Sequence, residues 1–407
     1  MGIAFAYCIQ RDHTVLNFLF VGHFRLRLVG QVLCSLCLYM AYSKENVDMR
    51  HAPFIRGLLL VLATFIIAPG ELRGEEPEDR YNFEFVTAPM VVSNPNFGNG
   101  GGATFMGLFD LAPGNENVQS SSLGLTGIYT DRGSHLLALG GNVLPSEAWR
   151  IKTAVADIGV KSELNVDELP QRADFTTAVR VIHLNVLYGF GEHFFAGMRG
   201  VVKDIGYSPD NEAGRQYLEA VNATDDLSAS LGPVLSFDTR DNRFFPYEGI
   251  YAEATLMLNP TILGSDESYG VLDGFINGYD QYRPGHVIAW RLYGRFTPSD
   301  TPYSDLSTLG RKADLRGYIA GENIARHLIS AQVEYRWKFR PKWAVVGFVG
   351  EAVLFDPGDL SRDSFYSSAG TGLRYLLSEE RRLNFRIDYA VGEDYSDGLY
   401  VGISEAF

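Results

Sequence analysis

Residues 329–339 have the sequence Ile-Ser-Ala-Gln-Val-Glu-Tyr-Arg-Trp-Lys-Phe, in which apolar and polar side chains alternate. The apolar residues occupy the odd positions from Ile329 to Phe339, and the polar residues occupy the even positions. A period of two is typical of a β-strand. Residues 383–390 repeat the pattern, again with charged side chains on one face only. Long rows of charges opposite apolar rows favour a barrel whose outside contacts lipid and whose lumen is polar.

Stretches of the same kind, separated by turn residues, continue through the chain from about residue 83. We predict strands near 227–240, 249–258, 270–280, 286–297, 328–339, 344–354, 368–377, 383–391 and 398–407. Seven more fit within 83–206, which makes about sixteen, an even number as such barrels usually have. The connectors between them are alternately short and long, as expected for turns on one side of a membrane and loops on the other. The sequence therefore predicts an all-β, transmembrane antiparallel barrel over 83–407.

The composition agrees with this fold and narrows the partners. The chain has 43 Gly, 22 Tyr and 26 Phe, and a formal net charge of -14, which argues against a nucleic acid as partner. The negative charge has two interpretations, an acidic barrel with polar loops or a pore that repels anions. All three cysteines, Cys8, Cys34 and Cys37, precede residue 40. A body without thiols suits an oxidising compartment and leaves no thiolate for a disulfide or a metal site.

The chain before the barrel has the features of a targeting segment. Residues 49–74 form a predicted signal peptide, with Arg50 and Arg56 before an apolar core from Leu58 to Ala68. Residues 75–82 form a short acidic linker. Residues 1–48 precede a normal signal, so we expect an over-extended start with translation beginning at Met49. The alternative is a genuine N-terminal anchor helix around residues 26–42.

Three motifs resemble those of the bacterial surface antigen superfamily, which includes BamA, TamA and the two-partner secretion transporters. The first is an R-G-Y motif in the longest late connector. The second resembles the family's D-x-R-D-N…F-P-x-x-G strand-and-turn signature. The third is an aromatic C-terminus after alternate apolar residues, which resembles the signal by which outer-membrane barrels are recognised for assembly. In order, the motifs comprise Leu315, Arg316, Gly317 and Tyr318; Asp238, Arg240, Asp241, Asn242, Pro246 and Gly249; and Leu399, Val401, Ile403 and Phe407.

The resemblance implies a long sixth extracellular loop that folds into the lumen with Arg316 at its tip. A buried guanidinium must be paired, and the family pattern implies Glu334 and Glu351 as its partners. Glu351 stands one residue away from the family's position, which in a strand turns it to the other face unless a bulge intervenes. The alternative is a solvated Arg316 without a fixed partner. Glu405 falls in the apolar register of the last strand, where we expect it at a wet end of the barrel.

The strand-and-turn signature has a structural interpretation. Pro246 and Gly249 suit a tight turn, because proline presets φ and glycine tolerates positive φ. We expect Asp238, Arg240 and Asp241 to form a charge cluster at the periplasmic rim. A catalytic carboxylate pair is the alternative, but no nucleophile or metal ligand is placed beside it by the sequence.

The resemblance implies insertion or translocation of proteins at the outer membrane of a Gram-negative bacterium, through a seam between the first and last strands. Family members that insert or secrete proteins usually carry periplasmic POTRA modules before the barrel. Only the short stretch 75–82 separates residue 74 from the first predicted strand, too few residues for such a module, so we expect a barrel-only member. Expected partners are outer-membrane lipid, the barrel-assembly machinery acting on this chain, and nascent outer-membrane proteins or a separate periplasmic partner. The alternative is a passive channel or structural surface barrel with a plugged lumen. We expect no enzymatic activity and no cofactor; an envelope lipase is the weakest possibility.

Overall fold

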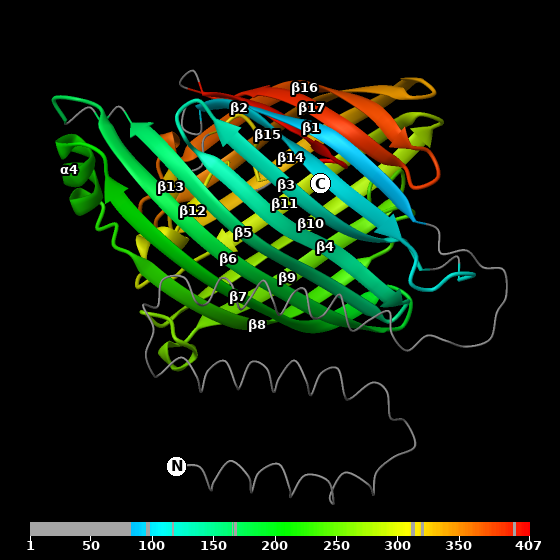
Figure 1. Cartoon of the computed structure of the whole chain (residues 1–407), viewed down its shortest axis with the longest axis horizontal. Helices are drawn as coiled ribbons and strands as arrows, with labels where there is room; N and C mark the ends of the chain where they lie inside the picture. Colours follow the sequence, from blue (N-terminus) through cyan, green and yellow to red (C-terminus); the bar gives the residue numbers. More distant parts are fainter. Residues whose placement is uncertain are drawn as a thin grey trace, which may run out of the picture. The chain divides into compact units, whose positions relative to one another are not determined.

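The computed structural model describes residues 83–94, 98–115, 118–164, 166, 169–310, 314–318, 321–393 and 396–407. Within these residues sixteen strands form one closed antiparallel barrel in which each strand pairs with its neighbour along the chain (Figure 1). The predicted number of strands is confirmed. The strands are β1 (Glu84–Asn94), β2 (Gly98–Phe109), β3 (Ser121–Thr130), β4 (His135–Ser146), β5 (Trp149–Leu164), β6 (Ala173–Phe190), β7 (Phe194–Pro209), β8 (Asp226–Asp238), β9 (Gly249–Asn259), β10 (Tyr269–Arg283), β11 (His286–Phe296), β14 (His327–Arg340), β15 (Trp343–Phe355), β16 (Phe365–Ser378), β17 (Leu383–Val391) and β18 (Asp397–Ile403).

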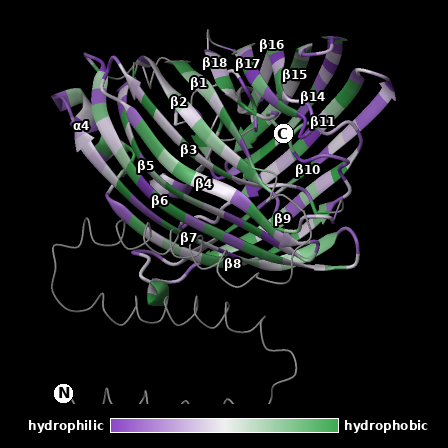
Figure 2. Ribbon diagram, turned by 45° about the vertical axis from the view of Figure 1, so that its right-hand side comes forward, coloured by the Kyte–Doolittle hydropathy of each residue, from purple (hydrophilic) through white to green (hydrophobic). Residues whose placement is uncertain are grey.

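The two faces of the barrel wall differ as the alternation predicts. In β14, Gln332, Glu334 and Arg336 are buried, whereas Val333 and Trp337 are 49% and 45% exposed. In a closed barrel the exposed face is the outer one, so apolar side chains cover the outside and polar ones line the inside. Figure 2 shows the resulting bands of hydrophobic and hydrophilic residues along the strands.

The connectors differ between the two ends of the barrel. One end, here called the loop end, holds the connectors 210–225, 260–268, 297–326 and 356–364, which contain α4 (Glu212–Ala220), η1 (Thr261–Leu263), η2 (Tyr303–Asp305), β12 (Ser307–Thr308), β13 (Ile324–Ala325) and η3 (Arg362–Ser364). The opposite end, the turn end, holds the short connectors 147–148, 191–193, 284–285, 341–342 and 379–382.

Connectors at both ends of the barrel depart from the predicted alternation of lengths. The connectors 110–120 and 239–248 are long although they lie at the turn end, and 131–134 is short although it lies at the loop end. For 239–248 the reason is visible, because side-chain hydrogen bonds give this segment a fixed conformation of its own (described below).

The barrel closes at a weak seam between its first and last strands. β1 and β18 are in register at Ser93 opposite Leu399, whereas β17 and β18 pair continuously from Phe385 opposite Ile403 to Val391 opposite Asp397. β18 ends at Ile403, and Ser404 has a φ of +75°, which turns the chain out of the strand direction. Among the described residues the seam is thus the least paired boundary of the barrel.

Three predictions fall outside the described residues, namely the over-extended start at 1–48, the signal peptide at 49–74 and the acidic linker at 75–82. In the part of the chain that the structure describes, the helices lack the length and apolar character that a membrane-spanning helix needs.

Candidate functional site

The connector 297–326, here called loop 6, carries the R-G-Y motif against the barrel wall. Gly317 has a φ of +102°, and a Cβ there would lie 2.9 Å from the backbone carbonyl carbon of Val391, so both conformation and space require glycine. The Gly317 N–H donates a hydrogen bond of 2.8 Å to the Tyr400 hydroxyl. The Tyr318 hydroxyl donates one of 2.6 Å to the carbonyl oxygen of Ser367. The motif is therefore docked on β16, β17 and β18.

The two apolar residues of the motif anchor it by burial. Leu315 is fully buried and Tyr318 is 3% exposed. Both belong to one apolar cluster with Leu309, Tyr293 and Leu328, which brings together loop 6, β11 and β14. Burial of large side chains of this kind contributes about 1.5–3 kcal/mol each. The loop tip is thus held by apolar packing as well as by polar contacts.

Arg316 forms two buried ion pairs. Its Nη2 lies 2.7 Å from Oε2 of Glu334 on β14, and its Nη1 lies 2.9 Å from Oδ2 of Asp388 on β17. Its guanidinium carbon lies 3.4 Å from the ring centroid of Phe348. The arginine side chain is 3% exposed and both carboxylates are fully buried. Arg316 therefore joins loop 6 to two strands, and Glu334 is the partner that the sequence predicts.

Further arginines complete a charge cluster, defined here as Arg316, Glu334, Arg336, Arg374, Arg386, Asp388 and Glu405. Arg336 lies 2.7 Å from Glu334, and Arg374 lies 2.5 Å from Asp388. Arg386 lies 3.3 Å from Asp388. Four guanidinium groups thus share three carboxylates, so each charge has a partner at hydrogen-bond distance, as burial demands.

The prediction that Glu351 pairs with Arg316 is wrong. Glu351 is exposed, on the opposite face of β15 from Phe348, and accepts a hydrogen bond of 3.0 Å from the Ser367 hydroxyl. The register between β14 and β15 is regular at Ala331 opposite Glu351, so there is no bulge there to turn the carboxylate inward. Asp388 supplies the second carboxylate instead. The alternation in 383–390 places Asp388 on the polar face, but no sequence signal indicates that β17 lies within reach of the loop.

Glu405 also differs from its expected position. Its side chain is 2% exposed, its Oε2 lies 2.8 Å from Nε of Arg374, and its Oε1 accepts a hydrogen bond of 3.1 Å from Asn384. The positive φ of Ser404 breaks the period of two just before Glu405 and turns it into the charge cluster. The expectation of a wet, outward-facing glutamate is therefore wrong.

The residues of the C-terminal motif do not all lie on one face of β18. Leu399, Val401 and Ile403 lie at alternate positions on one face of β18. Phe407 does not extend this row, because it packs beside Tyr279, which belongs to a cluster on β10 and β11. The main-chain oxygen of Phe407 accepts a hydrogen bond of 3.2 Å from Arg336. The last residues thus contact the charge cluster rather than the outer face.

The strand-and-turn signature builds the connector 239–248 at the turn end. The Asp241 carboxylate accepts hydrogen bonds from the backbone N–H groups of Tyr247 and Glu248, at 2.9 and 3.2 Å. The side-chain oxygen of Asn242 accepts two more, from Phe244 and Phe245, each of 2.9 Å. These bonds satisfy backbone donors locally, as Asx turns do.

Of the two residues predicted to suit a tight turn, Gly249 has the expected positive φ, in a connector of ten residues. Pro246 is buried within the connector. Gly249 has a φ of +105°, and a Cβ would lie 2.4 Å from the carbonyl oxygen of Thr239, so no larger residue fits.

The predicted rim cluster holds two of its three members. Nε and Nη2 of Arg240 lie 2.8 and 2.9 Å from the two carboxylate oxygens of Asp238, a bidentate pair. Arg150 of β5 joins Asp238 at 2.7 Å. Asp241 is separate from this pair and forms an ion pair with Arg382 instead.

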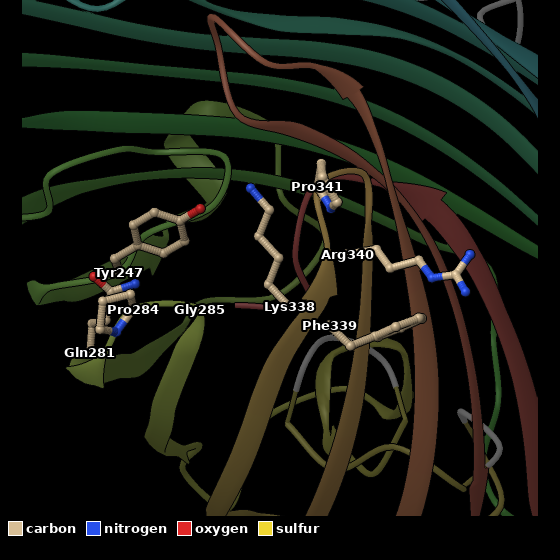
Figure 3. Close-up of a pocket in the computed structure, with 8 residues that line it drawn as sticks. All are labelled: Tyr247, Gln281, Pro284, Gly285, Lys338, Phe339, Arg340 and Pro341. Carbon is tan, nitrogen blue, oxygen red and sulfur yellow. The ribbon is translucent and has the colours of Figure 1, made fainter.

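A pocket of about 450 Å³ opens at the turn end, among the connectors 239–248, 284–285 and 341–342. In Figure 3 the Lys338 side chain extends toward Tyr247, while that of Arg340 points the opposite way. The lining of this pocket includes two cations, Lys338 and Arg340, and two aromatic rings, Tyr247 and Phe339.

A closed sixteen-stranded barrel with an apolar outer face and a charged inner face defines a β-barrel of the membrane-spanning class. The description "Omp85 superfamily domain" matches residues 167–407, which is more than half of the chain. The chain belongs to the Omp85 superfamily. A search of the curated proteins found no match.

Solved structures show the same fold at low sequence identity. BamA from Haemophilus ducreyi lacking POTRA domains 1–3 is 16% identical, with a TM-score of 0.50 over 81% of this chain and 71% of that chain. CdiB from Acinetobacter baumannii is 9% identical, with a TM-score of 0.53 over 79% and 65%. CdiB from Escherichia coli is 11% identical, with a TM-score of 0.54 over 81% and 62%. The chain thus spans less than two thirds of either CdiB chain.

Proposed function

We propose that this protein is an integral barrel of the outer membrane of a Gram-negative bacterium that inserts proteins into that membrane or translocates them. The proposed route is the seam between β1 and β18. One observation carries the proposal. Among the described residues, β1 and β18 are in register at a single pair, Ser93 opposite Leu399, in a chain that belongs to the Omp85 superfamily, a family of protein insertion and transport.

The physical argument concerns the edges of the two strands. A hydrogen bond of the sheet contributes about 0.5–1.5 kcal/mol net, so a boundary with one registered pair opens at a lower cost than any other. An open edge presents unpaired N–H and C=O groups, which an incoming strand pairs with by β-augmentation. Pro89 lies within β1, and proline within sheets is typical of edge strands.

The proposed partners follow from this route. They are outer-membrane lipid around the apolar outer face, nascent outer-membrane proteins at the seam, and a separate periplasmic protein that delivers them. For its own assembly the chain is proposed to use the barrel-assembly machinery. The proposed role is not enzymatic and needs no cofactor.

A crosslinking experiment tests the seam directly. A photo-reactive amino acid at Val401, on β18, should trap newly made outer-membrane proteins in cells that express the full chain. The matched control carries the same group at Val333, which is exposed on β14 but lies in a strand paired on both sides. Equal trapping at the two positions, or trapping at neither, would contradict the proposal.

A disulfide across the seam provides an independent test. Cysteines at Ser93 and Leu399 should lock β1 to β18 and abolish the trapping, which a reductant should restore. Cysteines at Val333 and Val349, which face each other in β14 and β15, form the control pair. If the locked seam still traps nascent proteins, the route lies elsewhere.

A second candidate is a passive channel or surface barrel whose lumen is plugged. It is favoured by the contacts of Arg316 with Glu334 and Asp388, from which we infer that the tip of loop 6 lies inside the barrel. Planar-bilayer conductance distinguishes the two candidates, because deletion of 300–326 should open a plugged channel. A pore that conducts equally with and without the loop argues against a plug.

A further inference from the structure

Two arginines share one carboxylate on the barrel wall at the turn end, far from the chain position of loop 6. Asp238 receives Arg240 through both oxygens and Arg150 at 2.7 Å. The side chain of Asp238 is 4% exposed and that of Arg240 is 9% exposed. The guanidinium carbon of Arg150 lies 3.6 Å from the ring centroid of Phe195, and that of Arg240 lies 3.9 Å from the ring centroid of Tyr251. Rings and hydrogen bonds together fix both arginines in place.

A third arginine reaches the same region from the connector 239–248. Nη2 of Arg243 lies 3.4 Å from the side-chain oxygen of Asn142 on β4. Asn142 stands opposite Lys152 in the pairing of β4 with β5, and Arg150 is the next residue of β5 on that face. Side chains opposite each other or one step apart on a face lie within reach. Arg243 therefore ends beside the other two arginines and faces a neutral amide.

The pKa of Arg243 is lowered by its burial and by the neighbouring arginines. Burial first, and then the positive charges of Arg240 and Arg150, lower the pKa of Arg243 to about 10. The group stays protonated at neutral pH, so its charge is retained at a cost that a bound anion would offset.

The positive charge here exceeds the negative charge. Around Asp238 there are three arginines and one carboxylate, which leaves two positive charges without a carboxylate. Glu253, on the neighbouring strand β9, is already shared by Arg199 and Lys152. This excess of positive charge is local to the group around Asp238. The chain as a whole has a formal net charge of -14, and the charge cluster around Arg316 holds nearly equal numbers of positive and negative groups.

We propose that Arg150, Arg240 and Arg243 form a binding site for an oxyanion of the phosphate class, either free phosphate or the phosphate of a lipid headgroup. A phosphate dianion matches the two excess charges, whereas a carboxylate matches one. Its several acceptor oxygens take guanidinium groups in the bidentate geometry that arginine prefers. The site is distinct from the seam and from the charge cluster, and it stands whether or not the barrel transports proteins.

Titration with inorganic phosphate tests the site. The full chain is purified in detergent without phosphate, and binding is followed by phosphorus NMR. Wild-type protein should bind saturably with a Kd in the millimolar range, and Arg243→Gln should weaken binding at least about tenfold. Arg283→Gln, which makes the same charge change at the turn end but outside the site, should leave the Kd unchanged. No saturable binding to the wild type, or equal binding to Arg243→Gln, overturns a site for free phosphate.

A second measurement separates the two sources of phosphate and guards against misfolding. Native mass spectrometry of protein exchanged into phosphatidylglycerol micelles should show retained phospholipid in the wild type and loss of it in Arg243→Gln if the ligand is a headgroup. Folding is checked by heat-modifiable migration in gels. If Arg243→Gln does not fold, Arg150→Gln replaces it in both assays. If a folded variant binds phosphate and retains phospholipid as the wild type does, the proposal is refuted.

Discussion

Replacing Arg316 with alanine should release the tip of loop 6 from the barrel wall. Arg316 forms buried ion pairs of 2.7 Å with Glu334 and 2.9 Å with Asp388, and removing one member of a buried pair typically costs about 3–5 kcal/mol. The two carboxylates keep Arg336 and Arg374 as partners, so neither is left without a cation. We therefore expect the low end of the range, about 3 kcal/mol, for undocking of the tip.

Proteolysis of loop 6 measures this free energy. When opening is fast relative to cleavage, the cleavage rate follows the population of the open form. At about 1.4 kcal/mol for each factor of ten, the rate of cleavage by proteinase K in loop 6 should rise about a hundredfold in Arg316→Ala. Proteinase K suits the assay because it does not depend on the arginine that is removed.

Arg326→Ala is the matched control. Arg326 belongs to the same loop and pairs with Asp356 at 2.6 Å, but the two side chains are 32% and 43% exposed. Exposed pairs contribute about 0–1 kcal/mol, so cleavage should rise less than about fivefold. If Arg316→Ala is cleaved at the wild-type rate, or no faster than Arg326→Ala, the buried pairs do not hold the loop and the reasoning fails.

Two further predictions concern stability, each followed by the midpoint of heat-modifiable migration. Gly317→Ala should lower the midpoint by the equivalent of about 2 kcal/mol, because it combines a φ of +102° with a clash against the backbone. Gly347→Ala, with open space around its Cβ, is the control. Equal midpoints for the two variants would show that the loop tip has room to adapt. Glu405→Gln should cost about 3 kcal/mol, because it removes a buried negative charge 2.8 Å from Arg374. Glu351→Gln should leave the midpoint unchanged, since Glu351 is exposed; an effect as large as that of Glu405→Gln would indicate that it belongs to the cluster after all.

The fold follows from the sequence to a large extent because side chains in a strand alternate by backbone geometry alone. The pattern at 329–339 assigns each residue of β14 to a face, and the structure has the same assignment. The number of strands follows from repeating that reasoning along the chain. The lengths of the connectors are less well predicted, since a segment such as 239–248 is stabilised by its own hydrogen bonds rather than by the barrel's symmetry.

The candidate site was predicted in part. Arg316 and Glu334 are recognisable from the resemblance of their motifs, and a buried arginine requires a carboxylate. Asp388 could not be selected in this way, because many acids share the polar face. Which of them meets the loop depends on the strand that closure of the barrel brings beneath it. Glu405 was misplaced because one residue, Ser404, adopts a positive φ that the sequence does not signal.

The sequence by itself determined the strands, the face of each residue within a regular strand such as β14 and the residues of the loop motif, because these depend on contacts between near neighbours and on a period set by the backbone. Only the tertiary structure decided which charges meet, how weakly β1 and β18 pair, and that Arg150 and Arg240 share Asp238. These features depend on how sixteen strands close into a ring. Closure brings together residues far apart in the chain, such as Arg150 and Asp238, with no pattern between them that a local reading could detect.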